Sequence, residues 1–344
     1  MNVNLTDMTC GELTELAKEL GEAGFRGKQI FEWLHRGAES FDEMTNLSKA
    51  FRQRLAEISY IGNIKIEEKY VSGIDETRKY LLKLDDGNFI ESVLMKYEHG
   101  YTICVSSQVG CRMGCRFCAS TLKGRTRNLT AGEIVGQVLC VQKDLGQRIS
   151  NIVMMGIGEP LDNFESVVKF LEIVTAPEGL NIGQRHISLS SCGLADKIRE
   201  LADMELQITL SISLHAPENE QRSAIMPVNK RFPIEELLAA CDYYIEKTGR
   251  RISFEYTLIS GVNDSLSEAD RLAELLHGRL CHVNLIPVNA VAETGFDKSG
   301  KRRVEAFRAR LESRRITATV RREMGSDINA ACGQLRNRHA DRDM

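Results

Sequence analysis

Three cysteines stand within eight residues of one another in the segment CVSSQVGCRMGCRFCAST. Cys111, Cys115 and Cys118 have the spacing C-x3-C-x2-C. A closed structural zinc site has four ligands, and a disulfide framework uses an even number of cysteines. Thiolates are soft ligands that suit zinc or an iron–sulfur cluster. The spacing therefore indicates a metal site with one position left open, as in a [4Fe–4S] cluster held by three cysteines.

The segments that follow the cysteines alternate between strand-like and helix-like patterns. Thr130 and Glu133 form a capping-box pattern at the start of the first helix-like segment. Repeated strand–helix units predict a parallel sheet, and six or seven units are too few for a regular eight-fold barrel. We therefore expect an α/β fold of the partial (β/α)6 barrel type. Its strands are predicted at residues 101–107, 151–156, 186–191, 206–215, 251–259, 282–288 and 316–321.

Polar or glycine-rich groups follow five of these predicted strands. The cysteines follow the first strand, and the segments GIGEP (156–160), SSCG (190–193), SLHAP (213–217) and PVN (287–289) follow four others. Each segment alone has an ordinary structural explanation, such as a turn glycine, a helix-capping serine or a histidine in the core. Their order along the chain predicts one site, because reactive groups of such barrels gather at the C-terminal ends of the strands.

The parts of the chain before the barrel have different patterns. Residues 1–62 have the 3.6-residue period of amphipathic helices and are expected to form a helical accessory domain. Residues 63–97 alternate with a period of two, which predicts a small β element. Residues 98–344 are then expected to form the barrel and to end in a C-terminal loop.

Composition narrows the class of protein. Hydrophobic residues make up 42% of the 344 residues and charged residues 27%, which is typical of a globular protein with a sizeable core. No run approaches the roughly 18 apolar residues that span a bilayer. We therefore expect a cytoplasmic protein without a membrane partner, in which ten cysteines indicate metal or redox chemistry rather than disulfides. Residues 298–344 carry 13 Lys/Arg against 6 Asp/Glu, and this predicts either a solvated helix face or a phosphate-binding patch.

The cysteine motif resembles that of the radical S-adenosylmethionine (SAM) enzymes. In that family the amino and carboxylate groups of SAM bind the open iron, and reduction of the sulfonium gives a 5′-deoxyadenosyl radical. A closer resemblance covers nearly the whole chain. The segments FRGKQIFEWLHRG, IVMMGIGEP, SLHAP, MPVNKRFP, EYTLISGVNDS, VNLIPVN and GSDINAACGQL are similar to those of the dual-specificity RNA adenine-C2 methyltransferases.

The resemblance implies a substrate and a set of site residues. The family methylates C2 of an adenosine in the peptidyl-transferase centre of 23S rRNA, and many members also methylate the adenosine 3′ of the tRNA anticodon. The three motif cysteines would hold the [4Fe–4S] cluster. The residues implied to contact SAM are Gly158, Glu159, Ser190, Ser213, Leu214, His215 and Asn289.

The resemblance also implies a route through protein thiols. Carbon 2 of adenine is electron-poor, so its direct attack on the SAM methyl group is implausible. Cys332 would first take a methyl group from one SAM, and a second SAM would be cleaved to the radical that activates this methyl group for addition to C2. Glu91 would remove the proton from C2, and Cys104 would release the product by a transient disulfide with Cys332. The other five cysteines are expected to be structural: Cys10, Cys140, Cys192, Cys241 and Cys281.

Two alternatives stay open in the sequence. One is a sister activity at C8 of the same ribosomal adenosine, which confers antibiotic resistance. The other is a zinc-binding RNA-binding protein without catalytic activity. For the methyltransferase we expect a monomer that takes electrons from a low-potential donor such as flavodoxin or ferredoxin. RNA contacts are expected from the basic C-terminal region and from Lys123, Arg125 and Arg127.

Overall fold

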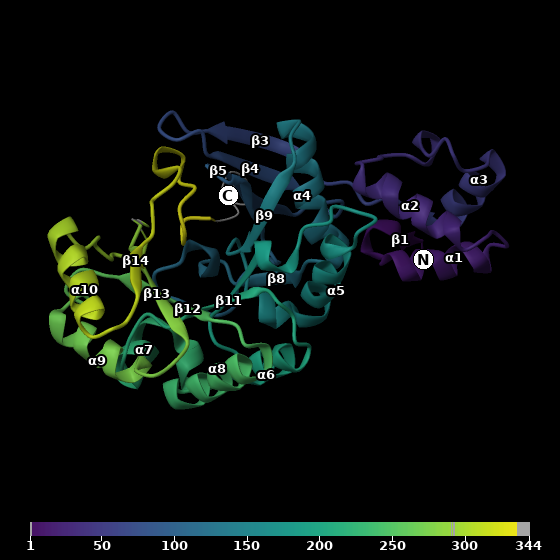
Figure 1. Ribbon diagram of the computed structural model, residues 1–344. Helices are drawn as coiled ribbons and strands as arrows, with labels where there is room; N and C mark the ends of the chain where they lie inside the picture. Colours follow the sequence, from purple (N-terminus) through teal and green to yellow (C-terminus); the bar gives the residue numbers. More distant parts are fainter. Residues whose placement is uncertain (1, 290, 292, 336–344) are drawn as a thin grey trace.

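A ten-stranded sheet forms the centre of the computed structural model, which describes residues 2–289, 291 and 293–335 (Figure 1). Its strand order is β14-β13-β12-β11-β10-β9-β6-β5-β4-β3. All neighbours from β6 to β14 are parallel, and the seven strands predicted for the barrel are confirmed. These strands are β6 (Gly100–Cys104), β9 (Ile149–Met154), β10 (Ile187–Ser191), β11 (Thr209–Ser213), β12 (Ile252–Leu258), β13 (Cys281–Pro287) and β14 (Ala318–Val320).

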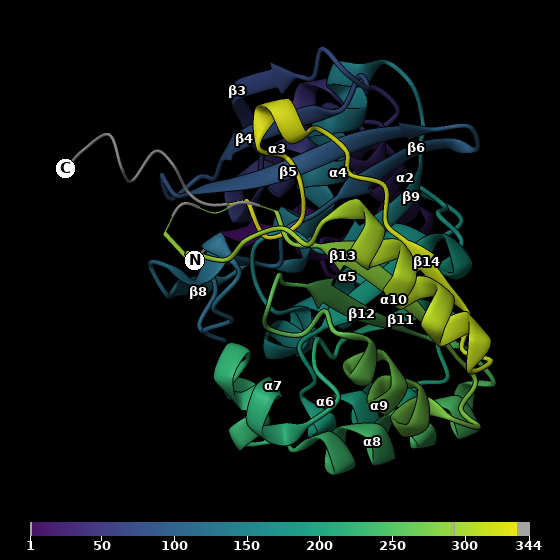
Figure 2. The ribbon, with the colours of Figure 1, turned by 90° about the vertical axis from the view of Figure 1, so that its left-hand side faces the viewer.

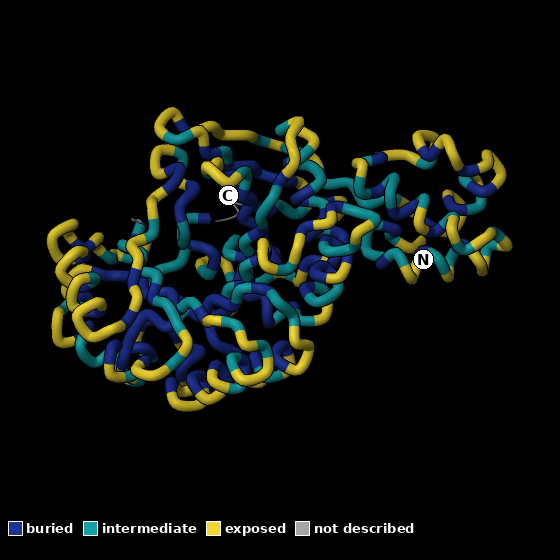
Figure 3. The backbone as a smooth tube through the Cα atoms, viewed as in Figure 1, coloured by how far each residue is buried: buried dark blue, intermediate teal, exposed yellow. Residues whose placement is uncertain are grey.

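Six helices make the crossovers between consecutive parallel strands and cover the outside of the curved sheet (Figures 1 and 2). The predicted capping box of Thr130 and Glu133 is present at the start of the first of them. Their inward faces are buried against the strands, as the dark interior of the arc shows (Figure 3). The partial (β/α)6 barrel is therefore confirmed. The helices are α4 (Ala131–Leu145), α5 (Phe164–Thr175), α6 (Ala195–Asp203), α8 (Ile234–Thr248), α9 (Leu266–Leu276) and α10 (Lys301–Ser313).

Shorter elements decorate the barrel. Helix α7 (Asn219–Ile225) lies in the connection from β11 to α8, and the ribbon of β7 (Gln108–Gly110) and β8 (Arg125–Asn128) flanks the cysteine motif. The described residues also include 3-10 turns at Leu5–Asp7, Phe41–Glu43, Ala119–Thr121, Pro160–Asn163, Gln184–His186, Pro227–Lys230 and Ser326–Ile328.

The strands expected at residues 63–97 extend the barrel sheet. They are β3 (Lys65–Val71), β4 (Arg78–Lys83) and β5 (Phe89–Tyr97), and they pair antiparallel with one another and with β6. Register places Val93 of β5 opposite Cys104 of β6. Because side chains alternate along a strand, Glu91, Val93, Met95 and Tyr97 share one face of β5.

The N-terminal helices form a small unit beside the barrel (Figure 1). Helices α1 (Cys10–Glu19), α2 (Phe25–His35) and α3 (Lys49–Ile58) bury an apolar face around Leu13, Phe31 and Phe51, and the parallel pair β1 (Val3–Asn4) and β2 (Ser59–Tyr60) joins their ends. The side chain of Asp7 accepts a hydrogen bond at 2.6 Å from the backbone N–H of Gly132 in α4. This contact attaches the unit to the barrel at a helix N-terminus, where a carboxylate is favourable.

The segment after β14, residues 321–335, returns across the open side of the barrel, and we call it the C-terminal loop (Figure 1). Its first half is bound to the β3–β4 turn by two hydrogen bonds of 2.9 Å, from Gly325 N–H to Asp75 and from Gly73 N–H to Asp327. Its second half is bound to the cysteine motif, where Ala119 N–H donates to Gly333 O at 2.8 Å. The loop thus joins the two edges that the incomplete barrel leaves apart.

Within the described residues, no helix combines the length and the apolar character needed to cross a membrane.

Candidate active site

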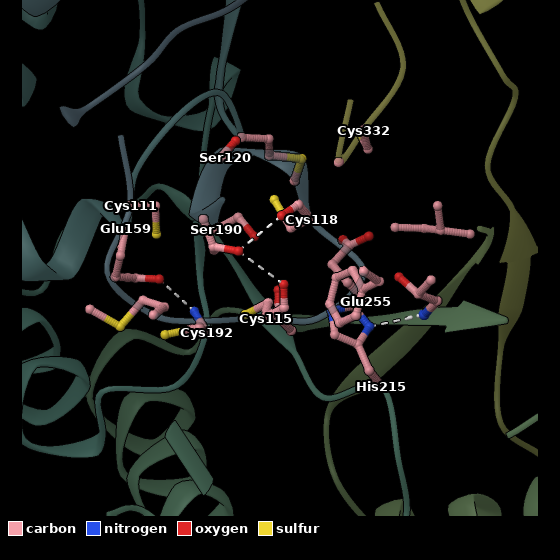
Figure 4. Close-up of a pocket in the computed structure, with 18 of the residues that line it drawn as sticks. Cys111, Cys115, Cys118, Ser120, Glu159, Ser190, Cys192, His215, Glu255 and Cys332 are labelled. Atoms are coloured by element: carbon pink, nitrogen blue, oxygen red, sulfur yellow. Dashed lines mark hydrogen bonds between the residues drawn. The ribbon is translucent and has the colours of Figure 1, made fainter. Parts of the chain in front are cut away.

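A pocket with a cavity volume of about 150 Å³ opens at the C-terminal ends of the parallel strands (Figure 4). The pocket brings together ten of the residues predicted from the sequence: Cys111, Cys115, Cys118, Gly158, Glu159, Ser190, Ser213, His215, Asn289 and Cys332.

The cysteine motif is a loop whose backbone is fixed at both ends. Cys111 N–H donates to Gly124 O at 2.9 Å, and Arg116 N–H donates to Ile225 O of α7 at 3.0 Å. Gly110 has φ of +75°, and a Cβ there would meet Gly124 O at 2.0 Å. Only glycine therefore allows the β7–β8 ribbon to approach this closely beside the first cysteine.

The three motif cysteines line the same pocket, and none of them is in a disulfide bond. Burial raises the pKa of Cys111 to about 12, and burial also raises the pKa of Cys115 and of Cys118. Without a metal these groups are therefore neutral thiols at neutral pH. Iron binding would displace their protons, because the thiolate is the ligand form.

This donor set fits a [4Fe–4S] cluster. Three soft sulfur ligands line the pocket. In an iron–sulfur cluster each thiolate binds a different iron atom, so the three sulfur atoms need not surround a single metal ion. In the described part of the chain, no three His, Cys, Asp or Glu side chains are grouped so as to hold a single metal ion.

The loop after β9 forms a rigid wall of the pocket. Glu159 is buried and accepts hydrogen bonds from Cys192 N–H at 2.7 Å and Leu161 N–H at 3.0 Å. Burial nevertheless raises the pKa of its carboxyl group. Gly158 has φ of +110°, and a Cβ would lie 2.7 Å from the side chains of Ser107 and Gln108. A side chain at position 158 would clash with Ser107 and Gln108 and would strain the backbone. The conformation of the loop at Gly158 and Glu159 therefore requires glycine at position 158.

His215 lines the pocket as a neutral imidazole. Its Nδ1 accepts a hydrogen bond from Thr257 N–H at 2.9 Å, so its proton lies on Nε2. Burial, aided by the nearby charge of Arg222, lowers the His215 pKa to about 3. The ring of Phe117, from the cysteine motif, packs edge-on at a centroid distance of 4.8 Å. These contacts fix the imidazole beside the motif.

Leu214 differs from its neighbours in the predicted cofactor site. Ser213 and His215 line the pocket, whereas the Leu214 side chain is fully buried in the hydrophobic core. Neighbouring positions at the end of a strand direct their side chains to opposite faces, so Leu214 faces the core. Its side chain therefore supports the site by packing, and its implied contact with SAM stays a prediction.

Cys332 enters the pocket from the C-terminal loop, above Cys118 and Ser120 in Figure 4. Asn289 donates from its side chain to Cys332 O at 2.9 Å, and Ser120 donates from its hydroxyl group to Leu335 O at 2.8 Å. The contacts of this loop with β13 and the cysteine motif hold Cys332 over the motif thiols.

Cys104 and Glu91 lie behind the pocket lining. Cys104 packs with Val93, Met324 and Ala330, under the C-terminal loop. Burial raises the Cys104 pKa to about 12; the nearby Cys332 thiol raises it further, and Arg321 opposes this shift. Cys104 and Cys332 are thus electrostatic neighbours, and both are free cysteines.

Glu91 is in a buried ion pair. Lys79 Nζ lies 3.5 Å from its carboxylate, and both side chains are at most 3% exposed. The same ammonium group donates to Asn329 O of the C-terminal loop at 3.3 Å. Lys79 therefore links Glu91 to the loop that carries Cys332.

Three of the pocket-lining residues that the sequence did not predict have ionisable side chains. Cys192, expected to be structural, lies in the same lining as the motif cysteines. Glu255 is 3% exposed, accepts a hydrogen bond from Asn284 at 2.7 Å and has its pKa raised by burial. Arg321 lies 3.8 Å from Glu255. The position of Cys192 in SSCG, after a strand, could have identified it, whereas a glutamate within a strand and an arginine directly after one carry no such pattern.

The basic residues predicted to contact RNA are largely paired within the protein. Arg125 contacts Asp162 at 2.7 Å, Arg127 contacts Glu133 at 2.7 Å, and Arg310 and Arg314 both contact Asp270. Such surface ion pairs contribute little stability, so the phosphates of an RNA can replace the carboxylates as partners of these arginines. The predicted basic region also includes Arg336, Arg338 and Arg342, which lie outside the described residues.

Comparisons with known proteins agree with this geometry. Residues 105–276 match the radical SAM superfamily, and residues 3–61 match the ribosomal RNA large subunit methyltransferase N-terminal domain. A radical SAM methyltransferase from Sphaerobacter thermophilus has a similar structure, with a TM-score of 0.93 and 45% identity, over 97% of this chain and 99% of that one. The fold and the three-cysteine pocket therefore define a radical SAM enzyme, a class that uses a [4Fe–4S] cluster and SAM. This assignment argues against the zinc-binding alternative.

Two related proteins identify the family within the radical SAM enzymes to which the chain belongs. A probable dual-specificity RNA methyltransferase RlmN from Clostridium perfringens (strain SM101 / Type A) is 60% identical over 97% of this chain and 96% of that protein. One from Alkaliphilus oremlandii (strain OhILAs), with the same description, is 57% identical over 98% of both chains. The chain belongs to the RlmN family of radical SAM RNA methyltransferases.

The depressed pKa of His215 predicts a pH-dependent stability. A histidine in the unfolded chain has a pKa of about 6.5, so below that pH the unfolded state binds a proton that folded His215, with its pKa of about 3, does not. Stability is therefore lost as the pH falls below about 6.5, by about 1.4 kcal/mol between pH 7.5 and 5.5 from this residue.

Urea unfolding of the metal-free protein at both pH values measures this loss. His215→Asn should lose correspondingly less stability on acidification than the wild type, and the exposed His277→Asn is the matched control. Equal acid sensitivity of the wild type and His215→Asn would show that His215 is not buried in its neutral form.

Proposed function

We propose that the protein methylates C2 of an adenosine in the peptidyl-transferase centre of 23S rRNA, and also the adenosine 3′ of the tRNA anticodon. The observation that carries the proposal is the pocket in which three free thiols of the cysteine motif meet Cys332. Membership of the RlmN family supports the choice of RNA as substrate and of C2 over C8.

The pocket residues divide into two proposed sets. Cys111, Cys115 and Cys118 would hold the cluster. SAM would contact Gly158, Glu159, Ser190, Ser213, Leu214, His215 and Asn289, all of which except Leu214 line the pocket. Bound together, the cluster and SAM supply a methyl donor and a radical that can remove hydrogen from an unreactive C–H bond. Neutral His215 can offer its Nε2–H to an acceptor on the cofactor, because Nδ1 is already occupied by Thr257.

The second set carries the methyl group. Cys332 would hold it as S-methylcysteine, in reach of both cofactor and adenine. The methylene radical formed on Cys332 would add to C2, and the adduct would lose one electron, for which the oxidised cluster would be the acceptor. Glu91 would take the proton from C2, and the Cys104 sulfur would then attack the Cys332 sulfur. An S–S bond forms, the S–C bond breaks, and its electron pair with a proton completes the methyl group. Arg321 favours the thiolate form of Cys104 that this attack needs, because its positive charge opposes the effect of burial on the Cys104 pKa.

The buried positions of Cys104 and Glu91 require the C-terminal loop to shift during the reaction. The target adenine must also leave its stack, at a cost of a few kcal/mol. Displacement of the loop would break the Lys79–Asn329 contact and uncover Glu91 beside the incoming base.

Further features of the reaction belong to the same proposal. Two SAM molecules would be consumed per methylation, used in turn in one pocket. Each cleavage of SAM requires one electron, for which a flavodoxin or ferredoxin is the proposed donor. We propose a cytoplasmic monomer, with residues 1–62 as an RNA-contacting accessory domain, 63–97 as a β element and 98–344 as the catalytic part.

Methylation in vitro tests the substrate and the position. Cluster-loaded enzyme, a low-potential reductant and SAM with a labelled methyl group are incubated with 23S rRNA fragments and tRNA that lack the modification. Mass spectrometry of the digested nucleosides should show labelled 2-methyladenosine in both RNAs. Labelled 8-methyladenosine would contradict the assigned position, and label in rRNA alone would restrict the substrate.

The roles of the two thiols have a separate test. Cys104→Ala should leave RNA covalently joined to Cys332, because the release step has lost its nucleophile. Denaturing gels with labelled RNA should show the adduct for Cys104→Ala, and they should show none for Cys104→Ala/Cys332→Ala. Cys281→Ala, at the opposite end of β13, is the control and should turn over without an adduct. Normal turnover by Cys104→Ala would contradict the proposed release step.

A further inference from the structure

Arg222 of α7 is a fully buried cation whose hydrogen bonds with the described residues all go to neutral oxygen atoms. It is 0% exposed and the largest of the fully buried side chains in the described part of the chain. Among the described residues, it forms no ion pair with a carboxylate. Its guanidinium group donates to Leu214 O at 3.1 Å, Ser213 O at 3.0 Å, Cys192 O at 2.7 Å and Asn229 Oδ1 at 2.9 Å.

A buried guanidinium group without a counter-charge is costly. Arginine does not lose its proton in proteins, and buried charges are normally paired. The four oxygen atoms compensate only part of the lost hydration, and burial accordingly lowers the Arg222 pKa from its ordinary value. The ionisable groups near Arg222 include the thiols of Cys192, Cys115 and Cys241 and the imidazole of His215.

One of these thiols belongs to the cysteine motif. Cys115 becomes a thiolate when it binds iron, so the negative charge near Arg222 would arise on cluster loading. The backbone brings the two together: α7, which carries Arg222, accepts a hydrogen bond at Ile225 O from Arg116 N–H, directly after Cys115.

Arg222 also joins two strand ends that carry predicted SAM contacts. Its Nη2 bridges Cys192 O, just after β10, and Ser213 O, at the end of β11. Gly193 has φ of +104°, and a Cβ there would lie 3.2 Å from Nη2. Glycine at this position thus allows the close approach of the guanidinium group to the β10 end.

We propose that Arg222 is a positioning residue that provides the positive charge opposite the thiolate-bound cluster, and that it raises the reduction potential of the cluster while it holds the β10 and β11 ends together. Reduction adds negative charge to the cluster, and a cation at close range in a water-poor interior stabilises the reduced form. The inference rests on the proposed cluster and adds a residue outside the cysteine motif that controls its chemistry.

Two substitutions separate the charge from the hydrogen bonds. Arg222→Lys keeps the charge and loses the four-bond geometry, whereas Arg222→Gln loses both. Arg231→Gln is the matched control, because Arg231 is exposed on the following segment and contacts Asp196. All proteins are loaded with cluster anaerobically, and the cluster is titrated with reductant and followed by electron paramagnetic resonance. Far-UV circular dichroism and thermal unfolding report the fold separately.

At a fixed ambient potential, the ratio of reduced to oxidised cluster in Arg222→Gln should fall at least tenfold, a shift of about 59 mV for one electron. Arg222→Lys should stay within about threefold of the wild type by the same relation, and Arg231→Gln should not change the ratio. The thermal midpoint should fall in both Arg222 variants. A folded Gln variant that holds no iron, beside a Lys variant that does, would also support the role of the charge.

Equal potentials in all four proteins would overturn the inference and leave Arg222 with a structural role alone. Equal shifts in the Lys and Gln variants, or loss of iron from both, would also overturn it, because the hydrogen bonds would then account for the effect. A wild-type protein that holds no cluster would instead contradict the proposed function.

Discussion

The C-terminal loop is held against two distant parts of the chain, and the proposed chemistry depends on those hydrogen bonds. The barrel is incomplete, so its first and last strands are not adjacent. Residues 321–335 cover that gap. At one end Gly325 N–H donates to Asp75 and Gly73 N–H donates to Asp327, and at the other Ala119 N–H donates to Gly333 O. Without this closure Cys332 would lie away from the motif thiols and Cys104 would be exposed. The loop brings together thiols that are more than 200 residues apart in the sequence.

Burial sets the charge state of nearly every group in the site. The thiols of Cys104, Cys111, Cys115 and Cys118 have raised pKa values, and His215 has a lowered one. The thiols and the imidazole of the site are therefore neutral, whereas Arg321, 3.8 Å from Glu255, is a cation in the pocket lining. Two buried cations, Lys79 and Arg222, lie behind the lining. Lys79 is paired with Glu91, and the ionisable neighbours of Arg222 include thiols and His215. A negatively charged cofactor would thus bind near cations that are already present.

Local patterns predicted much of the fold and part of the site. The strand-like segments predicted all seven parallel strands, and Thr130 with Glu133 predicted the start of a helix. Both patterns depend on residues that are neighbours in the sequence. The motif cysteines were found by spacing. Leu214 was predicted to contact the cofactor, and strand alternation directs its side chain to the core. Glu255, Arg321 and Lys79 could not be found in this way, because their partners are brought to them only by the folded sheet and the C-terminal loop.

The proposed chemistry depends first of all on an iron–sulfur cluster held by the three motif cysteines. Iron content and absorbance near 400 nm, measured on protein isolated anaerobically, test this requirement. The wild type and Cys241→Ala, which removes a thiol buried in α8 away from the pocket, should be brown and contain about four irons per chain. Cys118→Ala should lose the absorbance and most of the iron while keeping its fold. Retention of both by Cys118→Ala, or a colourless wild type that binds zinc instead, would contradict the account.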